Sequence, residues 1–216
     1  MSVSLRCYST SLGCPKNRVD TERLLGSLGV ALVPVESPDE AELVFINTCA
    51  FIQPATEESV RTIAQAIADI EELPKRPLLA VAGCLVGRYH AEDLAPELPE
   101  VDLWLDNSDL EAWPAMLARK LGLPEPTVPG RILSTGPSYA WLKISDGCRH
   151  ACSFCAIPNI RGGHRSHCKD MIVREARALL DQGVKELNLV AQDLTEWGCD
   201  LDGKQDLRTL LDGLLP

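Results

Sequence analysis

The chain has 216 residues, 45% of them hydrophobic, and its Asp and Glu residues outnumber Lys and Arg by 31 to 21, which gives a formal net charge of −10. This is enough apolar sequence to bury a core in one large domain or two smaller ones. The acidic balance argues against a protein that binds nucleic acid through an extended basic face.

The N-terminal sequence indicates a cytoplasmic protein, and this affects how its cysteines are interpreted. The N-terminus, "MSVSLRCYST", has no apolar stretch of signal-peptide length, and no run elsewhere reaches the roughly 18 apolar residues of a membrane span. We therefore expect a cytoplasmic protein without a membrane partner. Its nine cysteines are then expected to be metal ligands or reactive thiols rather than disulfides.

Short apolar runs alternate with helical patterns over the first 121 residues. Strands are predicted at 5–9, 31–35, 42–47, 78–82 and 101–105, and helices at 16–28, 56–73, 86–94 and 110–121. Such alternation is typical of a parallel sheet that helices cover on both faces. The sequence predicts a three-layer α/β domain over residues 1–121.

Prolines and glycines cluster without periodicity in "GLPEPTVPGRILSTGPS", which predicts a linker at 122–138. The second unit, 139–216, begins with a strand at 139–144 and continues with a long cysteine-bearing loop. A helix at 169–183, a strand at 185–193 and the beginning of another helix within 201–216 complete it. This pattern is one βα unit followed by a second strand.

Three cysteines in the second unit, Cys148, Cys152 and Cys155, form a CxxxCxxC motif on the loop that follows a strand. Three thiolates can hold three irons of a 4Fe-4S cluster and leave the fourth iron open to another ligand. The alternative is a zinc site, for which the chain offers further ligands nearby: His150, His164, His167 and Cys168.

Three cysteines in the first domain share one topological context. Cys14, Cys49 and Cys84 each follow an apolar strand and precede a helix, in "SLGCPKN", "INTCAFI" and "VAGCLVG". In a parallel sheet these positions meet at the carboxyl edge, which is the usual ligand-binding side of an open α/β fold. A buried free cysteine more often packs in the core as a small hydrophobic side chain than binds a ligand, but three repeats of one context argue for a shared site.

The motif and its flanks resemble a known family. CxxxCxxC after the first strand of a βα series, with Phe154 before the third cysteine, resembles the radical S-adenosylmethionine (SAM) superfamily. "YAWLKISDGCRHACSFCAIPNIRGGHRS" and "GVKELNLVAQDLTEWG" resemble the methylthiotransferases of that superfamily, and within them the RimO type. "GCPKNRVDTERLLG" and "INTCAFIQPATEESVRTI" match the same family in its N-terminal cluster domain.

The resemblance implies a set of cofactors and ligands. Cys148, Cys152 and Cys155 would bind the radical SAM 4Fe-4S cluster, whose open iron binds SAM and whose electron cleaves SAM to a 5'-deoxyadenosyl radical. Cys14, Cys49 and Cys84 would bind a second 4Fe-4S cluster that holds the sulfur for transfer. By their positions, Phe154, Gln192 and Asp193 are expected near SAM, and Arg161 and Arg165 are candidates to neutralise cluster or SAM charge.

The resemblance also implies a substrate and partners. The RimO type methylthiolates the β-carbon of an aspartate in small-subunit ribosomal protein S twelve, and needs an electron donor such as flavodoxin or ferredoxin and a sulfur source. Two alternatives remain open at this point. One is the MiaB-type enzyme that modifies transfer RNA, although the acidic composition makes direct nucleic-acid binding the weaker expectation; the other is a non-catalytic iron-sulfur or zinc-binding fragment.

The second unit is short for the barrel that the family uses. Residues 139–216 correspond to the first part of a radical SAM partial (β/α) barrel, whereas a complete barrel of six or eight units takes on the order of 200 residues. Nothing matches the family's C-terminal TRAM domain. We therefore expect the chain to correspond to the N-terminal portion of a family member.

Overall fold

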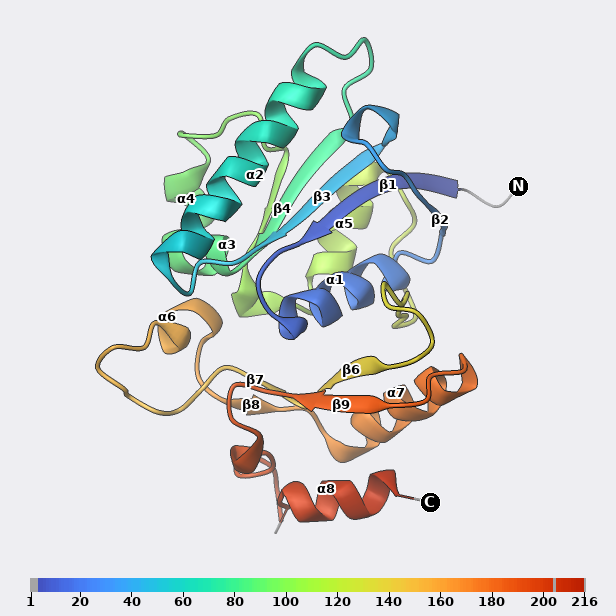
Figure 1. Ribbon diagram of the computed structural model, residues 1–216, viewed down its shortest axis with the longest axis vertical. Coiled ribbons are helices and arrows are strands. Elements are labelled where there is room, and N and C mark those ends of the chain that lie inside the picture. The colour runs from blue at the N-terminus through green and yellow to red at the C-terminus, as the bar shows by residue number, and fades with distance from the viewer. Residues whose placement is uncertain (1–3, 204, 216) are drawn as a thin grey trace. The chain divides into compact units, whose positions relative to one another are not determined.

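The chain divides after Ile132 into two units, each with its own core: Met1–Ile132 (unit 1) and Leu133–Pro216 (unit 2). The computed structural model describes residues 4–203 and 205–215 and is shown in Figure 1. Lys204 and Pro216, in the expected C-terminal segment 201–216, lie outside the described residues.

A five-stranded sheet forms the centre of unit 1. Its strands are paired in parallel in the order β2-β1-β3-β4-β5. The central strand β3 is buried along its whole length, as expected for a parallel sheet covered on both faces. The strands are β1 (Ser4–Ser11), β2 (Ala31–Pro34), β3 (Leu43–Thr48), β4 (Leu78–Gly83) and β5 (Leu103–Leu105).

Helices lie on both faces of this sheet (Figure 1). On one face, α1 and α5 pack against apolar side chains of β3 such as Leu43 and Phe45. On the other face, α2 contacts β3. The helices are α1 (Pro15–Ser27), α2 (Gln53–Glu71), α3 (Cys84–Tyr89), α4 (Ala91–Leu94) and α5 (Trp113–Leu121), with short 3-10 turns η1 (Pro38–Glu40) and η2 (Asn107–Asp109). The predicted three-layer α/β fold is confirmed.

Two helices differ from their predicted form. The single helix expected at 86–94 is split into α3 and α4, because His90 between them adopts a left-handed φ of 59°. The helix expected at 110–121 begins only at Trp113, after η2. At its other end α5 stops at Gly122, whose left-handed φ of 68° gives the usual helix termination.

The segment that follows α5 returns to α1 before unit 2 begins. Arg131 makes a buried ion pair with Glu22 (2.7 Å), and the amide of Gly130 donates a hydrogen bond to Ser27 Oγ (3.1 Å). Gly26 lies so close to the backbone of Arg131 that a Cβ atom would approach it to 2.5 Å. These contacts hold residues 130–132 on the surface of α1.

Unit 2 contains a parallel strand pair, β6 (Ala140–Lys143) with β9 (Leu187–Val190), and a short antiparallel pair, β7 (Ser145–Asp146) with β8 (Arg165–Ser166). Buried Ile172, Ala176 and Leu179 of one helix pack with Leu142 of β6 and with Trp197. The helices of unit 2 are α6 (Ile157–Arg161), α7 (Lys169–Asp181) and α8 (Leu207–Leu214), and η3 (Leu194–Glu196) follows β9. The segment 145–168, predicted as one long loop, thus contains the short helix α6 and both strands of the antiparallel pair.

Candidate functional site

Three cysteines lie at the carboxyl edge of the sheet in unit 1. Cys14 is the residue before α1, Cys49 follows β3 directly, and Cys84 is the first residue of α3, directly after β4. Cys49 and Cys84 are buried, and Cys14 is half-buried. The three segments are adjacent because β1, β3 and β4 are neighbours in the sheet.

Asn17, in the first turn of α1, connects the segments that carry these cysteines. Its Nδ2 donates hydrogen bonds to the carbonyl oxygens of Leu12 (3.0 Å) and Thr48 (2.7 Å). Its Oδ1 lies 3.9 Å from the sulfur of Cys14 and 3.8 Å from that of Cys84, and accepts hydrogen bonds from both thiols. One fully buried carboxamide therefore fixes two of the segments and contacts two of the thiols.

Gly13 allows the third cysteine, Cys49, to lie next to the segment that carries Cys14. Gly13 has a left-handed φ of 80°, and a Cβ atom built on it would lie 2.6 Å from Cβ and 2.7 Å from Sγ of Cys49. Cys49 therefore packs directly against the residue that precedes Cys14. The structure brings together all three cysteines that the sequence analysis proposed for this edge.

The three-thiol site fits an iron-sulfur cluster better than a single ion. Cysteine thiolates are the ligands that hold such clusters, and three of them leave one iron without a protein thiolate. Among residues 4–203 and 205–215, no group of three ligand atoms within 4.8 Å of one another includes Cys14, Cys49 or Cys84. The spacing is therefore wider than one tetrahedral zinc ion requires.

The second set of cysteines lies on the loop that follows β7. This loop is closed at its base, where the amide of Cys148 donates to the carbonyl of Gly162 (3.2 Å). A Cβ on Gly147 would collide with the carbonyl oxygen of Gly163, so the two ends of the loop meet there. Cys152 is exposed, whereas Cys148 and Cys155 are half-buried.

A zinc site around the second set is not formed within the described residues. No group of three ligand atoms within 4.8 Å includes Cys148, Cys152 or Cys155 there. Two histidines proposed as further zinc ligands have other neighbours: His150 lies 3.1 Å from Asp193, and His164 lies beside Asp200. The zinc alternative of the sequence analysis thus receives no geometric support.

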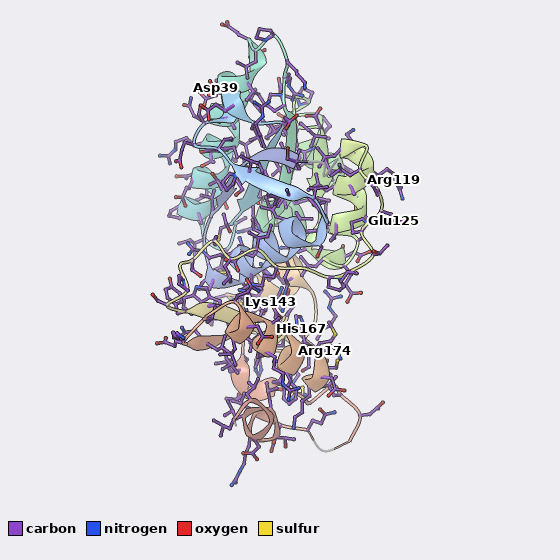
Figure 2. All side chains as sticks on the ribbon, turned by 90° about the vertical axis from the view of Figure 1, so that its right-hand side faces the viewer. Asp39, Arg119, Glu125, Lys143, His167 and Arg174 are labelled. Carbon is purple, nitrogen blue, oxygen red and sulfur yellow. The ribbon has the colours of Figure 1, made fainter. Side chains whose placement is uncertain are left out.

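Three buried charges lie at the base of the second loop. The Asp146 carboxylate accepts from Lys143 Nζ (2.9 Å) and from Arg161 Nη1 (3.1 Å), and from the backbone amide of Gly147 (2.9 Å). Burial works to raise the pKa of Asp146, but the two cations overcome it and hold the pKa well below its ordinary value. Lys143, labelled in Figure 2, and Arg161 are almost completely buried, so this cluster is part of the interior.

Sequence reasoning had treated Arg161 as a charge-neutralising group at the cofactor. The structure places its guanidinium against the Asp146 carboxylate instead, where it anchors the end of α6 to β7. The pairing of Lys143 with Asp146 three residues later was not recognised from sequence. A lysine and an aspartate flanking the apolar end of a predicted buried strand were the available signal.

The residues expected near SAM lie in different environments. Phe154 is 88% exposed, next to Cys155 on the loop. Asp193, at the carboxyl end of β9, is bonded to His150 and to Thr195, whose hydrogen bond is the main cause of its lowered pKa. Both side-chain amide atoms of Gln192 are shielded from solvent and have no hydrogen-bond partner within the part of the chain that the structure describes.

The remaining cysteines are separate from these sets. Cys7 belongs to the core of unit 1, and its burial raises its pKa to about 12. Cys168 precedes α7 and is exposed, and Cys199 is exposed on the segment after η3.

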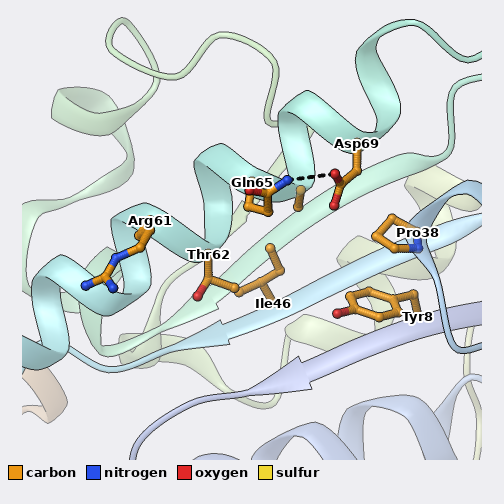
Figure 3. Close-up of a pocket in the computed structure, with 8 residues that line it drawn as sticks. Tyr8, Pro38, Ile46, Arg61, Thr62, Gln65 and Asp69 are labelled. Atoms are coloured by element: carbon orange, nitrogen blue, oxygen red, sulfur yellow. Dashed lines mark hydrogen bonds between the residues drawn. The ribbon is translucent and has the colours of Figure 1, made fainter.

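Figure 3 shows an open pocket between the sheet and α2 in unit 1, with a volume of about 290 Å³. Tyr8 and Ile46 come from the strands, and Gln65 and Asp69 from the helix, where they hydrogen-bond each other at 2.8 Å. None of the cysteines lines this pocket, so it is distinct from the carboxyl-edge site.

Comparison with known proteins identifies relatives of this chain. Residues 6–106 match the model of the family described as "Uncharacterized protein family UPF0004", a range that includes Cys14, Cys49 and Cys84. The chain is 68% identical over 209 residues to "Ribosomal protein uS12 methylthiotransferase RimO" of Nitratidesulfovibrio vulgaris (strain DP4). The chain is related to the N-terminal half of the RimO-type methylthiotransferases.

Other relatives of this type give the same result. The protein with the same name from Lawsonia intracellularis is 58% identical over 215 residues, and the one from Aquifex aeolicus is 49% identical over 207 residues. These alignments cover 94–99% of this chain but 45–49% of the relatives. The chain thus spans about half the length of the curated relatives it matches.

A solved structure supports the fold independently of sequence. The radical S-adenosylmethionine methyltransferase TsrM from Kitasatospora setae, with cobalamin and a [4Fe-4S] cluster bound, aligns with a TM-score of 0.57 at 12% identity. The alignment covers 90% of this chain and 48% of TsrM.

Within the described residues, no helix is long and apolar enough to cross a membrane.

Proposed function

We propose that this chain supplies the N-terminal half of a radical SAM methylthiotransferase of the RimO type. Unit 1, which contains the domain predicted at 1–121, would bind the second cluster. After a linker at 122–138, residues 139–216 would begin the radical SAM core. The observation that carries the proposal is the convergence of Cys14, Cys49 and Cys84 at one sheet edge in a chain closely similar to proteins of that name.

In unit 1, the three cysteines would hold a 4Fe-4S cluster through their thiolates. Asn17 keeps the segments before Cys14 and Cys49 in place through its two carbonyl contacts. Gly13 allows Cys49 to approach because it has no Cβ. Helix α1 starts directly after Cys14, and α3 starts at Cys84, so backbone amides near both residues would offset negative charge on the thiolates.

In unit 2, Cys148, Cys152 and Cys155 would hold the radical SAM cluster. The buried Lys143–Asp146–Arg161 cluster keeps the base of their loop fixed while its tip, with Cys152, stays accessible. The unpartnered amide of Gln192 makes this residue, with Asp193 and Phe154, the candidate contact for SAM. Bound there, the cluster and SAM together supply the radical chemistry, and the protein groups bind and orient them.

The proposed substrate is an aspartate of small-subunit ribosomal protein uS12, methylthiolated at its β-carbon. The names of the relatives support this choice over transfer RNA, and so does the acidic composition of the chain. The reaction would require an electron donor of the flavodoxin or ferredoxin class and a sulfur source, in the cytoplasm.

Anaerobic reconstitution of the 216-residue chain with iron and sulfide tests the cluster assignments. We expect about eight irons per chain, four for each cluster. Cys49→Ala and Cys152→Ala should each retain about four, and Cys168→Ala, at an exposed cysteine outside both sets, should retain all of them. Loss of both clusters in either single variant would contradict two independent sites. Zinc in place of iron, lost in the same two variants, would overturn the iron-sulfur assignment.

Product analysis separates binding from catalysis. The reconstituted, reduced chain is incubated with SAM, and 5'-deoxyadenosine is measured by chromatography. Formation of this product that depends on Cys152 supports the radical SAM assignment. Iron loading without any product would limit this chain to cofactor binding. Mass spectrometry of uS12 and of transfer RNA after incubation, with a full-length relative as the positive control, then distinguishes the RimO-type substrate from the MiaB-type substrate.

A further inference from the structure

Two segments of unit 2 that are far apart in sequence meet beside β8. The amide of Ser166 donates a hydrogen bond to Asp200 Oδ2 (2.9 Å), and the amide of Gly198 donates one to Ser166 Oγ (2.9 Å). These reciprocal bonds hold the strand residue against the segment that follows η3. The side chains on both segments are therefore fixed relative to each other.

Three potential metal ligands converge where these segments meet. The ligand atoms of His164, Cys199 and Asp200 all lie within 4.8 Å of one another. His164 Nε2 is 3.5 Å from Asp200 Oδ1, and the His164 side chain is only 3% exposed. We propose that His164, Cys199 and Asp200 form a binding site for a divalent cation of the zinc class, separate from both sets of cluster cysteines.

The donor set selects the class of metal. An imidazole nitrogen, a thiolate and a carboxylate are the three ligand types that proteins use for Zn²⁺, whereas Ca²⁺ and Mg²⁺ take oxygen ligands. Zinc bond lengths of about 2.0–2.3 Å place neighbouring tetrahedral ligands about 3.3–3.8 Å apart. Closing the present spacing requires side-chain movements of about 1 Å. Three protein ligands leave the fourth position for water or another small ligand.

The surroundings provide an outer contact for one of the proposed ligands. The Asp200 carboxylate receives the Ser166 amide on Oδ2, which leaves Oδ1 directed toward His164. The Ser166 hydroxyl lies 3.1 Å from His164 Nε2, the nitrogen that faces Asp200, so a metal bound to Nε2 would displace this contact. The Ser166 amide on Asp200 is an outer hydrogen bond of the kind that orients a ligand and raises metal affinity.

A neighbouring group of potential ligands is less suitable. His150, Asp193 and Glu196 also lie within 4.8 Å of one another. Glu196, however, forms a 2.5 Å ion pair with Arg149, so a cation already occupies this carboxylate. The guanidinium would have to leave before a metal could bind, whereas the Asp200 carboxylate is paired with a backbone amide and with His164.

Zinc binding to the reduced 216-residue chain tests the site. Competition with a chromophoric chelator gives the number and affinity of tight sites, and the cluster cysteines contribute equally in every variant. Cys199→Ser should remove one site and His164→Gln should weaken it at least about 100-fold. Cys168→Ser and His150→Gln are the matched controls and should bind as the parent chain does.

Cobalt substitution gives a second readout. A thiolate-to-Co²⁺ charge-transfer band should be smaller in Cys199→Ser than in Cys168→Ser by the contribution of one thiolate. Thermal unfolding in EDTA shows whether each variant folds as the parent does, and zinc should raise the unfolding temperature of the parent more than that of His164→Gln. Equal zinc stoichiometry, affinity and cobalt spectra in Cys199→Ser, His164→Gln and the controls would overturn the site, whatever the outcome for the clusters.

Discussion

Replacing Asn17 by Leu should destabilise unit 1 strongly. The change keeps the approximate shape of the side chain but removes the donors to the carbonyl oxygens of Leu12 and Thr48. A buried acceptor that loses its donor costs about 1–3 kcal/mol, so we expect a loss of about 3 kcal/mol in the free energy of unfolding. The change also removes the Oδ1 acceptor that the Cys14 and Cys84 thiols contact.

The expected change in unfolding temperature follows from the size of the unit. Unit 1 has 132 residues, and an unfolding entropy of about 2.1 cal/mol/K per residue gives about 0.28 kcal/mol/K. A loss of about 3 kcal/mol therefore lowers Tm by about 10 °C. Far-UV circular dichroism of the reduced, cluster-free chain measures this, and urea unfolding gives the free energy directly.

Asn107→Leu is the matched control for this prediction. Asn107 is also buried in unit 1, but its side-chain amide makes no hydrogen bond within the described residues. Leu at this position removes no donor from a protein acceptor, so Tm should change by no more than about 2 °C, the equivalent of about 0.5 kcal/mol. Equal effects of the two substitutions would refute the role assigned to the Asn17 amide.

Three further predictions concern other residues. Asp146→Asn should destabilise unit 2 by about 3–5 kcal/mol in urea unfolding, since two buried cations lose their counter-charge. The pKa of Asp146 is lowered in the folded state, so its stabilising contribution is complete above the unfolded pKa of about 3.9 and is lost as pH falls below that value. The parent and Asp146→Asn chains should therefore converge in stability only in acid. Gly13→Ala should lower iron loading by about four atoms per chain and should destabilise unit 1 by more than Gly29→Ala does. Gly29 is the matched control because it has a similar positive φ but open space around it. Equal effects of the two substitutions would refute the close packing of Gly13 against Cys49. Cys7, with its pKa raised to about 12, should resist alkylation at pH 8 while exposed Cys168 reacts, as peptide mass spectrometry would show.

The sheet and its carboxyl edge were predictable because both follow from local patterns. Alternating strand and helix signals indicate a parallel sheet, and the position of Cys14, Cys49 and Cys84 after strands then places them at one edge. The same reasoning could not find Asn17, because its partners Leu12 and Thr48 become neighbours only when β1 and β3 pair.

Other parts of the structure depend on contacts between distant residues. Nothing local in the sequence shows that Arg161 turns inward to Asp146, or that His164 lies beside Asp200. The break at His90 was missed for a similar reason, since its left-handed backbone lacks the glycine that usually marks such a position. These features are set by tertiary packing, which single-sequence patterns do not encode.

The placement of the first three cysteines constrains the order in which this protein matures. Cys14, Cys49 and Cys84 follow strands that become neighbours only in the complete β1-β3-β4 pairing, so the thiols are not held together in an unfolded or partly synthesised chain. Parallel pairing over such separations forms late and slowly. Insertion of the proposed cluster in unit 1 would therefore follow folding, and a carrier that delivers iron and sulfide would act on a finished sheet rather than on a nascent chain.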